Sequence, residues 1–164
     1  LEESFLIRKA VRYDIKGRRY INAPAKYYMV DLGLRNARLN FREFEEPHLM
    51  ENLIYNELII RGYQVDVGVV PIAEKNEKGN VVRRNTEIDF VANRGHQRIY
   101  IQVAYMIPSP EKLAQEIRPF LKVDDSFKKV LIVKDQLRPR QDEYGITTLS
   151  LQEFLLNPHI LQEI

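Results

Sequence analysis

The sequence predicts an α/β fold with a mixed sheet, preceded by a basic β-hairpin. From His48 the elements follow the order helix, three strands, helix, strand. The middle strands, residues 87–92 and 98–106, are joined too tightly for a parallel crossover, so they form an antiparallel pair. The strand that follows the second helix fits a parallel connection. These observations together indicate helices packed on a sheet of both strand directions.

The first part of the chain predicts short strands and then a helix. Residues 4–24 indicate an extended segment, a turn at Lys16 and Gly17, and a second short strand. Residues 26–30 predict a strand that ends before Asp31 and Gly33. Residues 48–61 follow a helical pattern closed by Gly62. Glu57 lies in the middle of the apolar stripe of this helix, which comprises Met50, Leu53, Ile54, Leu58 and Arg61.

The remaining elements follow from apolar runs and their boundaries. Residues 63–71 predict a strand, and residues 73–85, "AEKNEKGNVVRRN", predict a polar loop. Ser109 is an N-cap residue with Pro110 at the first helical position, so a helix begins there. The run "FKKVLIVKD" predicts a buried strand, and "YGITTLSLQEFLL" predicts a short strand and a terminal helix.

Composition excludes several classes of protein. The chain has 164 residues, 45% of them hydrophobic, which suits one domain or one domain with an appendage. It has no cysteine, and its three histidines are too far apart to form a helical metal-binding pair. No glycine-rich phosphate loop, nucleophilic serine motif or membrane-spanning run is present. We therefore expect a cytoplasmic protein, and the Leu1 start suggests an excerpt of a longer chain.

Charge is unevenly distributed along the chain. Up to Arg38 there are 9 basic and 4 acidic residues, and the rest of the chain has 16 basic and 19 acidic residues. Lys16, Arg18 and Arg19 lie at the tip of the predicted hairpin. This basic tip suits contact with a DNA phosphate backbone or an acidic partner. A solvated surface arm is an equally good interpretation.

Polar residues interrupt the two central strands. Pairing around Gly95 and His96 sets Asp89 opposite Gln102, and the helix over the sheet could bring Glu57 toward them. Two carboxylates and an amide oxygen are hard ligands that suit Mg²⁺, with Asp89 and Gln102 as the metal ligands. The alternative is structural. Glu57 and Arg61 would form an i, i+4 ion pair, and Asp89 and Gln102 would bond each other and nearby backbone.

The segments "KYYMVDLGLRN", "ENLIYNELIIRGY" and "EIDFV" followed by "YIQVAY" resemble the C-terminal domain of unknown function of a large prokaryotic AAA+ ATPase family. The resemblance covers nearly the whole chain. It implies a PD-(D/E)XK, or restriction-endonuclease-like, domain at residues 41–164. It also implies that residues 1–40 are a winged-helix-like wing with a connecting strand, and that an absent N-terminal ATPase domain is the partner in the same chain.

The resemblance also assigns site residues. Glu57 matches the helical glutamate of the nuclease motif, Asp89 the metal-binding aspartate and Gln102 the second acid. The next motif position calls for lysine, and here it is Ala104. Such a lysine orients the attacking water and offsets charge on the phosphate, which alanine cannot do. Recruitment of Lys112 or Lys134 is an alternative.

Three functions follow from these observations. The first is a catalytically degenerate nuclease-fold module that binds DNA or a partner for the attached ATPase. The second is an active Mg²⁺-dependent DNA endonuclease that uses Glu57, Asp89 and Gln102. The third is a protein-interaction or oligomerisation domain, with the apolar face of "SLQEFLLNPHILQEI" as its docking surface, although a core helix is the more ordinary interpretation of that segment.

Overall fold

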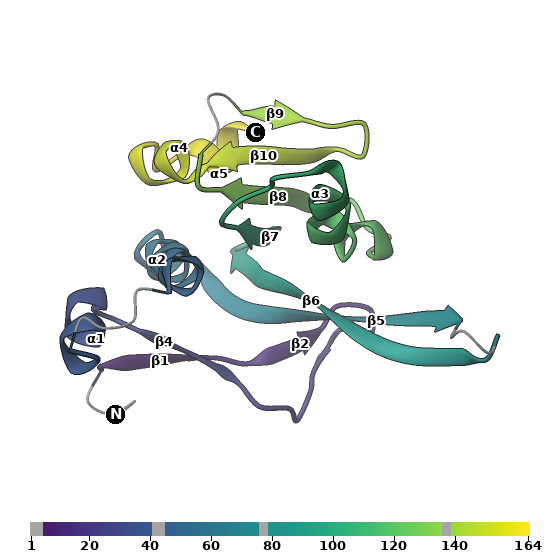
Figure 1. The fold of residues 1–164 in the computed structure, drawn as a ribbon, viewed down its shortest axis with the longest axis horizontal. Helices are drawn as coiled ribbons and strands as arrows, with labels where there is room; N and C mark the ends of the chain where they lie inside the picture. Colours follow the sequence, from purple (N-terminus) through teal and green to yellow (C-terminus); the bar gives the residue numbers. More distant parts are fainter. Residues whose placement is uncertain (1–4, 41–44, 76–78, 136–138) are drawn as a thin grey trace.

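A computed structural model describes residues 5–40, 45–75, 79–135 and 139–164 (Figure 1). The strands are β1 (Ile7–Ala10), β2 (Arg12–Asp14), β3 (Arg19–Tyr20), β4 (Lys26–Met29), β5 (Gln64–Lys75), β6 (Val81–Arg94), β7 (Gln97–Ala104), β8 (Lys128–Val133), β9 (Arg140–Gln141) and β10 (Ile146–Ser150). The helices are α1 (Leu32–Arg38), α2 (Glu46–Ile60), α3 (Pro110–Ile117), the 3₁₀ turn η1 (Phe120–Lys122), α4 (Leu151–Leu156) and α5 (Ile160–Glu163). The predicted order from the α2 helix onward is confirmed.

The sheet is mixed, as the sequence predicts. Eight strands follow the order β3-β2-β5-β6-β7-β8-β10-β9, and β1 pairs separately with β4. The central β6 and β7 are antiparallel, whereas β7, β8 and β10 run parallel to one another. The parallel connection between β7 and β8 passes through α3, which is the arrangement expected for a crossover.

The hairpin around Lys16 and Gly17 forms, and it is part of the main sheet. Strands β2 and β3 pair antiparallel, and β2 also pairs in parallel with β5 through Arg12 and Val67. The Asp14 carboxylate accepts a hydrogen bond from the Gly17 amide at 2.8 Å and closes the turn. The first forty residues therefore contribute two strands to the same sheet as the rest of the chain.

The prediction of a loop at residues 73–85 is wrong for most of the residues that the structure describes in this range. Strands β5 and β6 continue as a two-stranded ribbon, in which Ile72 faces Arg84 and Lys75 faces Val81. Figure 1 shows this ribbon projecting beyond the other strands. A ribbon that water reaches on both faces has no need of alternating apolar residues, so its sequence resembles that of a polar loop.

Two apolar layers cover the sheet. Residues of α2, α4 and α5 pack on one face together with Phe90 and Ile101, and residues of α3 and η1 pack on the other face together with Tyr100 and Leu131. In the terminal segment the side chains of Phe154, Ile160 and Leu161 are buried in the first layer. The face considered for docking is thus part of the core, as the ordinary interpretation of this segment expects.

Helix α1 is an element that the sequence analysis missed. Asp31 is its N-cap, and the Asp31 carboxylate accepts a hydrogen bond from the Leu34 amide at 2.9 Å. The signal was present, because an aspartate after a strand and before an apolar residue is typical of a helix start. Within the described ranges, no helix is both long and apolar enough to cross a bilayer.

Candidate functional site

The structure brings Asp89 and Gln102 together. Phe90 of β6 pairs with Ile101 of β7, so Asp89, which precedes Phe90, lies beside Gln102, which follows Ile101. The Asp89 amide donates to Gln102 Oε1 at 3.3 Å, and the Val103 amide donates to Asp89 Oδ2 at 2.8 Å. The two polar side chains are therefore fixed by hydrogen bonds across the strand pair.

A bulge in β6 determines where Asp89 points. Val91 pairs with Asp66 and Ile88 pairs with Gly68, so two residues of β6, Asp89 and Phe90, oppose the single Val67 of β5. The backbones approach closely here. A Cβ at Gly68 would lie 2.9 to 3.0 Å from atoms of Ile15, Ile88 and Val91. Glycine is needed at this position because no side chain fits.

The bulge directs Asp89 toward a lysine that the sequence analysis did not single out. The ammonium of Lys26, on β4, lies 3.1 Å from Glu51 Oε1, 3.7 Å from Asp89 Oδ1 and 3.8 Å from Glu87 Oε2. We call Lys26, Glu51, Glu87 and Asp89 the Lys26 cluster. One cation lies within 4 Å of three carboxylates that come from one helix and one strand.

Strand β4 is held against helix α2 by hydrogen bonds and ring stacking, and these contacts fix the position of Lys26. Both backbone groups of Met29 bond the Asn52 side chain, at 2.9 and 2.8 Å. The Tyr28 ring stacks on Tyr55 at 4.1 Å, and the Tyr28 hydroxyl donates to Glu51 Oε1 at 2.6 Å. Glu51 therefore has two donors, Tyr28 and Lys26, and its carboxylate is oriented toward the cluster.

Burial and charge act on the titrating groups of the Lys26 cluster. Burial and the neighbouring Glu51 carboxylate raise the pKa of Asp89 to about 7, against the opposing influence of Lys26 and the Val103 amide. Burial alone would lower the pKa of Lys26, but Glu51, Asp89 and Glu87 together raise it above its ordinary value. Lys26 therefore stays charged at neutral pH, whereas Asp89 gains or loses its proton at a pH close to neutral.

Glu57, which the sequence analysis placed at the site, lies elsewhere. It forms an ion pair with Arg61 at 2.7 Å, and Arg61 also donates to the carbonyl oxygens of Phe154 and Asn157 near the end of α4. Six positions of a helix turn the chain by about 600°, so Glu51 and Glu57 lie on faces about 120° apart. Among the described contacts, Glu51 is the α2 carboxylate that joins Asp89 through Lys26.

The structure also locates Ala104 and the two lysines that the sequence analysis considered in place of the missing lysine, Lys112 and Lys134. Ala104 is buried in the α3 layer. The Lys112 ammonium pairs with Glu116 at 2.5 Å, and Gln102 Nε2 donates to the other oxygen of Glu116 at 3.4 Å. Lys134 contacts the Tyr105 hydroxyl. Lys112 is thus linked to Gln102 through Glu116, and the ammonium beside Asp89 is that of Lys26.

These residues do not fit a resident Mg²⁺ in their present arrangement. In the part of the chain that the structure describes, no three His, Asp or Glu side chains converge closely enough to hold a metal ion. The Lys26 ammonium already supplies positive charge to the carboxylates, and Gln102 Oε1 is engaged with the Asp89 amide. A dication would have to displace the ammonium from three oxygens.

The basic residues of the hairpin lie at the margin of the sheet. Lys16, Arg18 and Arg19 are exposed, and the Lys16 ammonium donates to the Pro71 carbonyl at 3.0 Å. The hairpin tip therefore lies beside the base of the β5–β6 ribbon, where Arg83 and Arg84 are also exposed. We call Lys16, Arg18 and Arg19 the basic margin; Arg83 and Arg84 lie across β5 from it, on β6.

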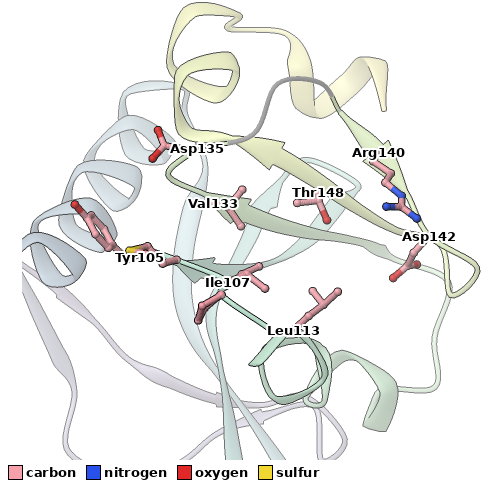
Figure 2. Close-up of a pocket in the computed structure, with 10 residues that line it drawn as sticks. Tyr105, Ile107, Leu113, Val133, Asp135, Arg140, Asp142 and Thr148 are labelled. Carbon is pink, nitrogen blue, oxygen red and sulfur yellow. The ribbon is translucent and has the colours of Figure 1, made fainter. Parts of the chain in front are cut away.

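A separate pocket of about 480 Å³ opens beyond the carboxyl ends of β7 and β8. Figure 2 shows Asp135 and Tyr105 at one end of it, Arg140 and Asp142 at the other, and apolar side chains between them. None of the residues that the sequence analysis named for a site lines this pocket. The Lys26 cluster and this pocket are distinct features of the fold.

The chain is similar to part of a longer protein. It is 33% identical over 156 residues to an uncharacterized protein of Haemophilus influenzae, an alignment that covers 95% of this chain and 35% of that protein. The chain thus spans about a third of the relative that it matches. No family model matches the chain, and no solved structure matches it.

Proposed function

We propose that this chain is a nuclease-fold module that binds DNA without cleaving it, as one part of a longer ATPase protein. The order of α2, three strands, α3 and β8 supports the nuclease-like interpretation. So does the location of Asp89 and Gln102 on the central antiparallel pair. The alignment with about a third of a longer relative is compatible with an attached AAA+ ATPase domain.

The Lys26 cluster is the observation that carries the non-catalytic part of the proposal. Metal-dependent phosphodiester cleavage needs carboxylates free to hold a dication and an ammonium free to contact water and phosphate. Here the ammonium is bound by the carboxylates themselves, at 3.1 to 3.8 Å. Ala104 supplies no charge at the usual lysine position. The cluster is therefore a closed ion-pair network that stabilises the junction of α2, β4 and β6.

The basic margin supports the DNA-binding part of the proposal. Lys16, Arg18 and Arg19 form no ion pair with a described carboxylate, so their charges are available to phosphates. Neutralising phosphates releases counterions, which makes affinity fall as salt rises. The exposed Arg83 and Arg84 add positive charge on β6, the other strand of the ribbon.

Fluorescence anisotropy with labelled duplex DNA, measured at several salt concentrations, tests the proposal. We expect wild-type protein to bind with a clear salt dependence. We expect the triple variant Lys16→Glu, Arg18→Glu, Arg19→Glu to bind more weakly, with a slope against log salt that falls by about 0.9 for each phosphate that the protein no longer neutralises.

The matched control reverses three exposed basic residues elsewhere, Lys9, Arg38 and Lys122. It changes net charge equally and removes no residue of the basic margin. An equal decrease in affinity in both triple variants would mean that net charge alone matters, and unchanged binding in the hairpin variant would contradict the proposed interface.

A further inference from the structure

A second pocket lies where the β2–β3 hairpin meets the β6–β7 turn and the segment before β8. It has a volume of about 390 Å³, and its lining includes Tyr13, Arg18, His96, Arg98 and Phe127. Three separate parts of the chain thus bring aromatic and basic side chains into one concave site. Among them, the sequence analysis considered Arg18 alone as a site residue.

The Arg98 guanidinium lies over two aromatic rings. Its guanidinium carbon lies 5.0 Å from the centre of the Tyr13 ring and 5.5 Å from the centre of the Phe127 ring. Its Nε donates to Asn93 Oδ1 at 2.8 Å, which fixes the plane of the group. A guanidinium held in this way keeps its charge and presents a planar surface.

Exposed rings extend this site. The side chain of Phe127 is 40% exposed, and that of Tyr20 is 64% exposed. Tyr20 meets Tyr13 edge-on, with ring centres 5.5 Å apart. Water-exposed rings next to a flat cation are the arrangement that single-stranded nucleic acid uses for stacking its bases.

Two arginines at the pocket can bind an anion. Arg18 reaches it from the hairpin tip, where its backbone has a positive φ of 51°, an uncommon conformation for a residue with a side chain. Two carboxylates also lie at or near the pocket: Asp125, which lines it, accepts from the Tyr100 hydroxyl at 2.7 Å, and Asp66 accepts from the Tyr20 hydroxyl at 3.1 Å. Neither Arg18 nor Arg98 forms an ion pair among the described residues, so both can bind a phosphate.

From these observations we infer that the pocket binds one unpaired base of a DNA strand together with its flanking phosphate. The base stacks on Phe127 and the Tyr13–Tyr20 pair, and Arg98 and Arg18 bind the phosphate. This inference rests on the proposed DNA binding and narrows it to single-stranded segments, because a paired base is stacked within its own duplex.

Binding of a single-stranded oligonucleotide that carries one 2-aminopurine tests the inference, because stacking quenches the fluorescence of that base. We expect wild-type protein to quench it and to bind the single strand more tightly than a duplex of equal length. Phe127→Ala should lower affinity for the single strand about tenfold, with little change for the duplex. The control Phe5→Ala removes an equally large ring that is 83% exposed, and should change neither.

Arg98→Lys provides a second variant, which tests the pocket if Phe127→Ala does not fold. It keeps the charge but removes the flat surface of the guanidinium, so it should reduce the quenching. Unchanged single-strand affinity and quenching in the folded variants would overturn the pocket while leaving the proposed function intact, provided that the hairpin triple variant still binds DNA more weakly. Failure of wild-type protein to bind any DNA would overturn both.

Discussion

The Lys26 ammonium lies 3.7 Å from the Asp89 carboxylate, although the two residues are 63 positions apart in the chain. The contact depends on two local features. Strand β4 is bonded to α2 through Met29 and Asn52, and a bulge in β6 turns Asp89 toward that strand. The positive charge beside Asp89 thus comes from the N-terminal part of the chain.

Removing this ammonium should destabilise the protein in a pH-dependent way. In Lys26→Met, Glu51, Glu87 and Asp89 lose their shared cation. Breaking a partly buried pair of this kind costs on the order of 2 to 4 kcal/mol. The destabilisation should be larger at pH 8 than at pH 5, because Asp89 takes up a proton as the pH falls. Urea unfolding at both pH values measures it, and equal destabilisation at the two values would contradict the prediction.

Asp89 should make the wild-type protein less stable as the pH rises from about 4 to about 7. Its folded pKa, about 7, is above the ordinary value of 3.8, so in this interval the folded state binds the proton and the unfolded state does not. The contribution of Asp89 to stability is therefore largest below the pKa that Asp89 has in the unfolded state. It declines until the pH passes the pKa that Asp89 has in the folded state. Asp89→Asn should remove this component of the profile.

The control for that profile is Asp135→Asn, which changes an exposed carboxylate at the end of β8. Its unfolding free energy should follow the wild-type pH dependence. A profile of Asp89→Asn that also matches wild type would show that Asp89 titrates normally in the folded state.

Glu51 and Glu57 should behave differently, although both lie on α2. Glu51→Gln weakens the hold on Lys26 and should make unfolding less dependent on Lys26, so that the double variant with Lys26→Met is destabilised by less than the sum of the single variants. Glu57→Gln should show no such coupling, because its partner is Arg61. A double-mutant cycle by urea unfolding measures both, and strong coupling of Glu57 with Lys26 would contradict the placement.

Arg61 should matter more for stability than a comparable exposed arginine. Its side chain is 5% exposed and bonds Glu57 and two carbonyl oxygens near the end of α4. Arg61→Gln should cost about 2 kcal/mol or more, because the Glu57 carboxylate loses its charged partner and the Phe154 carbonyl loses this donor. Arg118→Gln removes a pair whose arginine is 49% exposed and should cost less than about 1 kcal/mol. Thermal unfolding compares the two variants, and similar costs would contradict the prediction.

The sequence was sufficient for the elements whose signals are local. Ser109 begins α3 as expected, and Gly95 lies in the turn that joins β6 and β7. The contact of Asp89 with Gln102 also followed from counting residues around that turn. Such features depend on a few neighbouring residues, which a single sequence contains.

The rest depends on contacts between distant parts of the chain. Helix α2 is surrounded by the sheet, β4 and α4, so it buries Asn52 and Asn56 as well as its apolar residues. Its apolar stripe therefore did not identify the face that meets Asp89, and Glu57 was favoured over Glu51. The bulge and the approach of Lys26 left no local pattern. The close approach of side chains at Gly68 becomes visible only when three strands are placed together.

One gel measurement tests the central proposal, DNA binding without cleavage. Supercoiled plasmid is incubated with saturating wild-type protein in Mg²⁺ or Mn²⁺, and each sample is run before and after removal of the protein. We expect retarded migration before removal and intact supercoiled plasmid after it. Nicked or linear plasmid that appears with wild-type protein and disappears with Asp89→Asn would show an active nuclease and contradict the proposal, as would the absence of any retardation.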